Sequence, residues 1–233
     1  MGQNLDRLIR NDSKLRGTLA AKQIAVSVHM TGGQEYGFLF AMQLDLDADQ
    51  PEVHEALRAT FRSTEIESRV YDFENVNSFL SPFFDGRMFY FIKDELLVFS
   101  LSEVLAEESV RTLVQNASVL GQKQFIAVRQ TIDDDARAHL YVNYEQLKPV
   151  LAQYASSKSQ GADFCNQPFA DWSALDFLIE NDAVFLNGFV VASDSSRAWL
   201  DAFSGQEPPK IRLLKYLPSN TAYFAFLGYG DYG

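Results

Sequence analysis

The chain has 233 residues, of which 47 % are hydrophobic and 22 % charged, a composition that fits a folded globular protein and excludes a disordered one. Its formal net charge is −11, from 31 acidic and 20 basic residues. Because binding to nucleic acid or to an anionic membrane surface requires clustered Lys and Arg, this balance argues against both partners. The sequence contains no run of the ~20 apolar residues needed to span a bilayer, and its single cysteine, Cys165, excludes an intramolecular disulfide.

The first quarter of the chain reads as helix, hairpin and helix. Apolar residues at helical spacing predict a short amphipathic helix over residues 4–15. Alternating apolar residues predict a hairpin with strands over 22–30 and 36–46, in which Gly32 and Gly33 supply the turn. Pro51 in a first turn, followed by an apolar stripe as far as Phe61, predicts the next helix.

The middle of the chain is expected to hold a second group of strands and a helix. We predict strands over 67–80, 87–91 and 96–101. Ser102 then caps a helix whose apolar residues extend to Val114. A short apolar run over 125–128 predicts a further strand.

The last part of the chain predicts a third group. A strand over 138–142 leads into a helix near whose start Pro149 must lie. A hairpin over 172–180 and 183–192 follows a polar loop. A helix capped by Asp194 and a last strand over 221–227 complete the prediction.

These elements predict an α+β fold. Adjacent strands joined by tight turns imply an antiparallel sheet, built here from repeated strand–strand–helix units whose helices cover one face. Residues 1–205 would form this domain, and residues 206–233 a linker and the first strand of a following, truncated unit. We therefore expect the chain to be a segment of a longer polypeptide.

Five segments of the sequence resemble elements of a known family. They are KQIAVSVHM at 22–30, AHLYVNY at 138–144, NGF at 187–189, GQEPP at 205–209 and YLPSNTA at 216–222. This family is an uncharacterised domain of unknown function in large envelope proteins of Gram-negative gut-type bacteria. The resemblance implies a full-length protein with one N-terminal membrane anchor and a long extracytoplasmic part, in the periplasm or cell envelope. It carries no catalytic role.

The three histidines and the cysteine are the candidate reactive groups of the sequence. His29, His54 and His139 include no pair at i, i+4 and have no Glu or Cys beside them in a zinc pattern, so ordinary structural histidines are favoured. Cys165 lies in a polar loop next to the acidic Asp163, which disfavours the thiolate that a nucleophile needs.

Acidic and glycine-rich segments give no better match to a known site. Residues 133–135 are three consecutive aspartates and residues 45–49 hold three alternating ones, but neither has the glycine of a calcium loop. Gly32-Gly33 and the segment 228–230 lack the lysine and the strand–turn–helix context of phosphate loops. We therefore predict no catalytic, cofactor-binding or metal-binding residues, and no cofactor.

Aromatic residues are the remaining unusual feature, with 19 Phe and 10 Tyr in the chain. They cluster at 83–84, 89–91 and 223–226. Because consecutive strand residues point to opposite faces, such rings either pack under helices on both sides or form an exposed apolar contact surface.

The sequence is compatible with two functions. The first is a non-catalytic extracytoplasmic scaffold or interaction segment of a larger envelope protein, with an unknown protein or glycan partner. The alternative is a binding protein for an apolar or glycan ligand on the sheet face. An enzyme, a hydrolase using a pair of the scattered carboxylates, is the weakest hypothesis, because no feature of the sequence selects such a pair.

Overall fold

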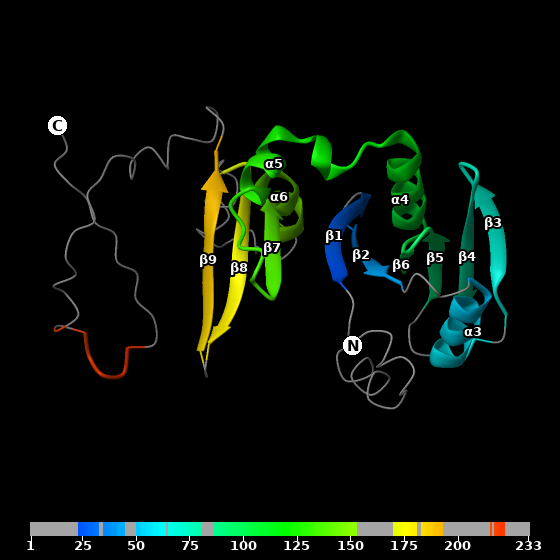
Figure 1. Ribbon diagram of the computed structural model, residues 1–233, viewed down its shortest axis with the longest axis horizontal. Coiled ribbons are helices and arrows are strands. Elements are labelled where there is room, and N and C mark those ends of the chain that lie inside the picture. Colours follow the sequence, from blue (N-terminus) through cyan, green and yellow to red (C-terminus); the bar gives the residue numbers. More distant parts are fainter. Residues whose placement is uncertain are drawn as a thin grey trace. The chain divides into compact units, whose positions relative to one another are not determined.

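The computed structural model describes residues 23–32, 35–44, 50–63, 65–80, 86–152, 170–180, 183–192, 215 and 217–221. They belong to two compact units, between which the chain first passes after Gln122. The first unit holds a six-stranded sheet and the second a three-stranded sheet, and every strand pairing in both is antiparallel (Figure 1). The predicted antiparallel α+β fold is therefore confirmed.

The six-stranded sheet joins an N-terminal hairpin to a four-stranded meander. Its strands are β1 (Ile24–Gly32), β2 (Glu35–Gln43), β3 (Glu67–Tyr71), β4 (Glu74–Leu80), β5 (Arg87–Lys93) and β6 (Leu96–Ser100). Their order is β1-β2-β6-β5-β4-β3, so β2 pairs with β6 across a long sequence separation. Among the described residues, strands β1 and β3 therefore form the two edges of this sheet.

The prediction of one strand over 67–80 was wrong, because the chain turns back at Asp72 and Phe73. These two residues have φ values of 45° and 70° and connect β3 to β4. Two-residue hairpin turns require positive φ at both central positions, which is why Asn-Gly or Asp-Gly is their usual signal. With Phe at the second position, the turn carries only half of that signal.

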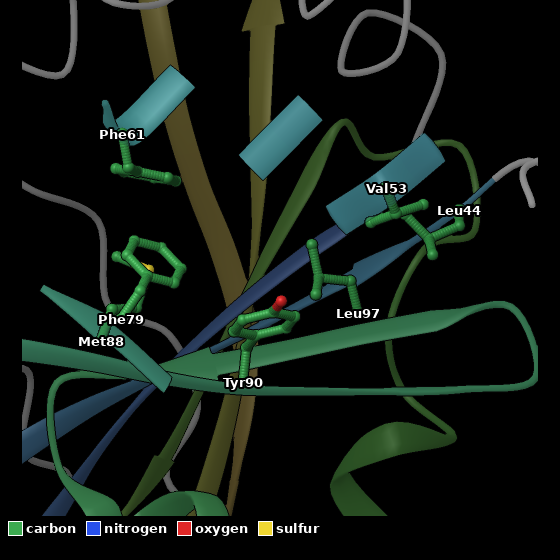
Figure 2. Packing of buried hydrophobic residues seen from close by; sticks show 7 residues of the cluster. All are labelled: Leu44, Val53, Phe61, Phe79, Met88, Tyr90 and Leu97. Carbon is green, nitrogen blue, oxygen red and sulfur yellow. The ribbon is translucent and has the colours of Figure 1, made fainter. Parts of the chain in front are cut away.

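Two helices pack against this sheet on opposite faces. Helix α3 (Gln50–Phe61) contributes to one cluster of buried side chains and helix α4 (Glu103–Gln115) to another. Figure 2 shows the first cluster, which consists of Leu44, Val53, Phe61, Phe79, Met88, Tyr90 and Leu97. The second consists of Val76, Phe91, Val98, Ala106 and Val110.

The expectation that the helices cover one face was therefore wrong for this sheet. Tyr90 and Phe91 are consecutive residues of β5 and are 0 % and 1 % exposed, so both faces of the strand are buried. A sheet that is apolar on both faces needs a helix on each of them.

The ends of α4 follow the sequence signals. The hydroxyl of Ser102 accepts a hydrogen bond from the amide of Leu105 at 3.4 Å, as an N-cap does, and confirms the predicted cap. Asn116 ends the helix in the left-handed conformation. A short 3₁₀ turn, η1 (Val119–Gly121), follows.

The second unit contains a three-stranded sheet in the order β7-β8-β9, formed by β7 (Ala138–Asn143), β8 (Trp172–Glu180) and β9 (Ala183–Val191). The predicted hairpin of β8 and β9 is confirmed. Helix α5 (Lys123–Arg129) occupies the segment for which a strand was predicted. That prediction was wrong because Phe125 and Val128, the buried residues of the segment, stand three apart and share one helical face.

Helix α6 (Tyr144–Ala152) follows β7 directly. Pro149 is its sixth residue, so the prediction that this proline lies near the helix start was wrong. The proline removes one backbone hydrogen bond, and the helix ends three residues later.

The predicted strand–strand–helix repeat is not confirmed. The second group contributes four strands before its helix, and the third has α6 between β7 and β8. The helices predicted over 4–15 and after Asp194 lie outside the described residues, as does the domain boundary at residue 205. Of the predicted last strand only Thr221 is described. No helix in the described ranges is both long and apolar enough to cross a membrane.

Candidate functional site

The three histidines lie on three different elements. His29 is on β1, where its Nε2 lies 2.8 Å from the hydroxyl of Ser27, and partial desolvation lowers its pKa while the nearby Glu108 opposes that shift. His54 is on α3 and His139 is on β7, in the second unit. The structure thus gives each of them separate surroundings.

His139 pairs with a buried carboxylate that the sequence analysis did not single out. Its Nδ1 lies 2.8 Å from Oδ1 of Asp176 on β8, which is 5 % exposed. The backbone amide of Asp133 donates to the other carboxylate oxygen at 2.9 Å. Both oxygens of Asp176 are therefore satisfied, as a buried charge requires. An aspartate within the otherwise apolar run 174–179 of β8 was the signal available in the sequence.

The acidic segment 133–135 is part of the same arrangement. The amide of Asp135 donates to the carboxylate of Asp133 at 3.0 Å, which makes the segment a local turn. Within the ranges that the structure describes, no three His, Cys, Asp or Glu side chains gather in a way that could hold a metal ion. Residues 45–49, Cys165 and the glycines at 228 and 230 lie outside those ranges.

A pocket of about 410 Å³ lies between α3 and the β3–β4 side of the first sheet. It is open and shallow, and it is lined by His54, Glu55, Arg58, Glu65, Ile66 and Asn77. Helix α3 supplies the first three of these residues, the segment before β3 the next two, and β4 the last. The lining mixes hydrogen-bond donors and acceptors with one aliphatic side chain.

Tyr90 anchors His54 at the inner side of this pocket. The tyrosine is fully buried, and the first cluster surrounds its ring while the hydroxyl points toward α3 (Figure 2). His54 Nδ1 lies 2.5 Å from that hydroxyl. Burial raises the pKa of Tyr90 and lowers that of His54, with Glu55 opposing the second shift, so both groups are neutral at pH 7.

The hydrogen bond fixes which imidazole nitrogen carries the proton. The buried Tyr90 hydroxyl keeps its proton and has no other acceptor among the described residues, so it donates to Nδ1 of His54. A neutral imidazole that accepts at Nδ1 carries its proton on Nε2. His54 therefore offers its Nε2–H group, for which the described part of the chain has no acceptor.

Asn77 forms the floor of the pocket. It is only 7 % exposed, and its carbonyl oxygen accepts from the hydroxyl of Ser68 at 2.8 Å. Its amide nitrogen has no acceptor among the described residues. Asn77 is thus a nearly buried residue of the pocket lining whose NH₂ group has no hydrogen-bond acceptor among the described residues.

The described aromatic cluster serves the core. Residues 89–91 pack under helices on both faces, which confirms the first of the two predicted alternatives. Phe73, at the tip of the β3–β4 turn, is instead 95 % exposed. The clusters at 83–84 and 223–226 lie outside the described residues.

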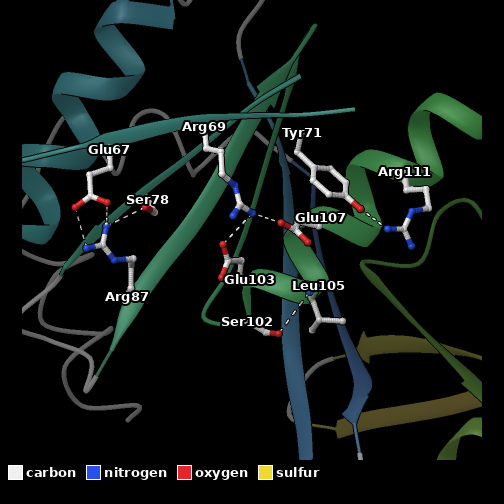
Figure 3. A network of polar contacts seen from close by, with 10 residues as sticks. All are labelled: Glu67, Arg69, Tyr71, Ser78, Arg87, Ser102, Glu103, Leu105, Glu107 and Arg111. Atoms are coloured by element: carbon white, nitrogen blue, oxygen red, sulfur yellow. Dashed lines mark hydrogen bonds and ion pairs between the residues drawn. The ribbon is translucent and has the colours of Figure 1, made fainter. Parts of the chain in front are cut away.

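The two edges of the six-stranded sheet differ in charge. Edge strand β3 has five residues, and its Arg69 pairs with Glu103 and Glu107 of α4 (Figure 3). Its Glu67 forms an ion pair at 2.8 Å with Arg87 on β5, the strand on the far side of β4. Edge strand β1 has nine residues and contains no Asp, Glu, Lys or Arg. Charged residues are the usual protection of an edge against pairing with another strand, so β3 has this protection and β1 lacks it.

Strand β1 also exposes an apolar stripe. Ile24, Val26 and Val28 alternate along the strand, and Phe38 on β2 is paired with Val28. These four side chains are 41–56 % exposed. The stripe continues inward through the stacked rings of Phe40 and Phe99, whose centroids are 4.8 Å apart, toward the cluster beneath α3. We call Ile24, Val26, Val28 and Phe38 the β1 stripe.

Within the part of the chain that the structure describes, strand β9 is a sheet edge of the same character. It has nine residues and no charged side chain, and Val184, Phe185, Leu186 and Phe189 are each more than half exposed. Sequence patterning showed these strands as alternating or apolar runs but could not show that they lie at sheet edges.

Comparison with known proteins found no matching family model, no matching curated protein and no matching solved structure.

Proposed function

We propose that the chain is a non-catalytic interaction segment of a larger extracytoplasmic envelope protein, and that it binds an extended segment of a protein partner along strand β1. The observation that carries the proposal is the contrast between the charged, short edge β3 and the uncharged, nine-residue edge β1. The location in the envelope rests on the family resemblance of the sequence.

Strand addition fits both chemical features of β1. An edge strand presents backbone N–H and C=O groups that an extended peptide can pair with, and alternate side chains determine which peptide fits. The β1 stripe lies on one face only, because Ala25, Ser27 and His29 occupy the other. A partner strand with apolar residues at every second position would extend both the sheet and its apolar face.

Covering the stripe would contribute substantially to affinity. Complete burial of a Val or Ile side chain is worth about 1.5–3 kcal/mol, so side chains that are half exposed offer roughly 1 kcal/mol each. Four such residues together offset only the lower end of the cost of association, roughly 4–15 kcal/mol, so the backbone hydrogen bonds of the added strand and its own side chains would have to supply the rest of the affinity.

The non-catalytic character is supported by the structural uses of the polar residues. Asp176 accepts from His139 and from the backbone of Asp133, and this bonding accounts for all three as fold-stabilising groups. Arg69, Glu103 and Glu107 tie β3 to α4.

Native mass spectrometry of the chain purified from its own host tests the proposal. Wild-type protein is expected to carry a co-purifying protein, and the Val26→Lys variant is expected to lose it, because a charge on an edge strand blocks pairing. Val70→Lys is the matched control, since Val70 lies on the opposite edge and is 68 % exposed. Retention of the partner by Val26→Lys, or its loss from both variants alike, would refute the assignment of β1.

The ligand-binding alternative has its own supporting observation, the polar pocket beside α3.

A further inference from the structure

We propose that the pocket lined by His54, Asn77 and their neighbours binds a neutral sugar residue. The inference rests on the ligand-binding alternative and not on strand β1. It starts from two pocket-lining residues whose N–H groups have no acceptors in the described chain, the amide of Asn77 and the ring of His54.

These donors are held in place before any ligand arrives. The Ser68 hydroxyl fixes the Asn77 amide from one side, and the buried Tyr90 hydroxyl fixes the His54 ring. Tyr90 and Asn77 are cross-strand partners on β5 and β4, so Asn77 and the tyrosine that holds His54 occupy neighbouring positions on one face of the sheet. Pre-organised donors lose little entropy on binding, which favours a specific ligand over a passing solvent molecule.

The rest of the lining supplies acceptors and an apolar wall. Glu55 and Glu65 offer carboxylate oxygens, and Ile66 offers an aliphatic surface. A sugar hydroxyl both donates and accepts, so adjacent hydroxyls match alternating donors and acceptors. The C–H face of a sugar ring suits an aliphatic wall, as ligand sites combine apolar lining with a few placed polar groups.

Charge argues against an anionic ligand. The two glutamates and Arg58 give the lining a formal charge of −1, since His54 is neutral. Arg58 is also engaged with Glu55 at 2.9 Å, which takes up part of its positive charge. The volume of about 410 Å³ lies at the small end of ligand sites and suits one sugar residue better than a long chain.

A titration of the isotope-labelled chain followed by NMR tests the proposal. The probes are D-glucose, D-galactose and N-acetyl-D-glucosamine, each raised to about 10 mM so that millimolar dissociation constants are detectable. At least one sugar is expected to change the chemical shifts of the backbone amides of Ile66, Asn77 and the α3 residues that line the pocket. Sodium phosphate and methylammonium, titrated in the same way, represent anionic and cationic ligands.

Two variants localise the response. Asn77→Asp keeps the acceptor for Ser68 but removes the NH₂ donor, and it is expected to weaken sugar binding at least tenfold. Asn75→Asp places the same change on an exposed residue of the same strand and is expected to leave binding unchanged. Should Asn77→Asp lose its folded spectrum, Glu65→Gln on the exposed rim replaces it, with weaker sugar binding expected.

Shifts with methylammonium or phosphate alone would overturn the proposal, as would the absence of any shift at the pocket with all three sugars. Sugar-induced shifts that survive both pocket variants would overturn it as well. Failure of the sugar proposal would not affect the proposal for strand β1. The Val26→Lys experiment concerns a different surface and measures a different property, the co-purification of a protein.

Discussion

His54 on α3 and Tyr90 on β5 are joined by a 2.5 Å hydrogen bond that ties the helix to the middle of the six-stranded sheet. The bond satisfies a hydroxyl that is buried among Phe79, Leu97 and the apolar side of α3. It also holds a neutral imidazole at the wall of the pocket, so the core and the candidate ligand site share one polar contact.

This arrangement predicts a loss of stability in mild acid. The pKa of His54 is lowered in the folded protein, so below its ordinary value of about 6.5 the unfolded chain binds more protons than the folded one. The free energy of unfolding should therefore fall as the pH drops from about 6.5, before most carboxylates titrate. Urea unfolding at several pH values between about 7.5 and 5 measures the slope.

His54→Gln should make that slope shallower. His29 contributes in the same direction because its pKa is also lowered, so some pH dependence should persist in the variant. An unchanged slope in His54→Gln would show that His54 is not the group that titrates.

In the β3–β4 turn, replacement of Phe73 by glycine is expected to stabilise the protein. Phe73 is held at a φ of 70° with its ring almost wholly exposed, so the turn carries backbone strain without a compensating contact in the described structure. Phe73→Gly removes the strain and is expected to raise the free energy of unfolding by roughly 1 kcal/mol. Thermal and urea unfolding of both proteins measure the difference.

Val70→Gly serves as the comparison for that variant. It introduces a glycine within β3, where the backbone is extended, and should lower stability by about 1 kcal/mol. Destabilisation by Phe73→Gly as well would mean that the Phe73 ring makes a contact worth more than the turn strain.

In the second unit, we predict that position 188 tolerates no side chain larger than that of glycine. A Cβ atom there would collide with the backbone carbonyl of Ala174 and lie 2.8 Å from Cα of Leu175, and backbone atoms of a paired strand cannot yield. Gly188→Ala should cost about 3 kcal/mol and loosen the pairing of β8 with β9. Hydrogen exchange of these strands, with Trp172 fluorescence as a second probe, reports the effect.

Gly121→Ala is the control for crowding at Gly188, because a Cβ atom at Gly121 would meet open space. It should change stability by less than about 0.5 kcal/mol. Equal effects at the two glycines would contradict the close approach at Gly188.

The sequence predicted the elements whose signals are local. The hairpin of β1 and β2, the cap at Ser102 and the hairpin of β8 and β9 all follow from alternation or from a capping residue. Prediction from the sequence failed where the same residues fit two different structures. Phe125 and Val128 fit a strand run or one face of a helical turn, and only packing separates the two.

The candidate surfaces depended on long-range pairing and could not be predicted in the same way. Whether β1 lies at an edge follows from the pairing of β2 with β6, more than fifty residues apart in the sequence. His54 was noticed in the sequence, but its partner Tyr90 and its neighbour Asn77 reach it only through the packing of α3 on the sheet.

Hydrogen exchange of strand β1, with and without the co-purified partner, tests strand addition most directly. Strand addition predicts that the β1 amides not bonded to β2 exchange more slowly in the complex, while the amides of edge strand β3 exchange at the same rate in both samples. Protection confined to β3 or to the second unit, with β1 unchanged, would contradict it.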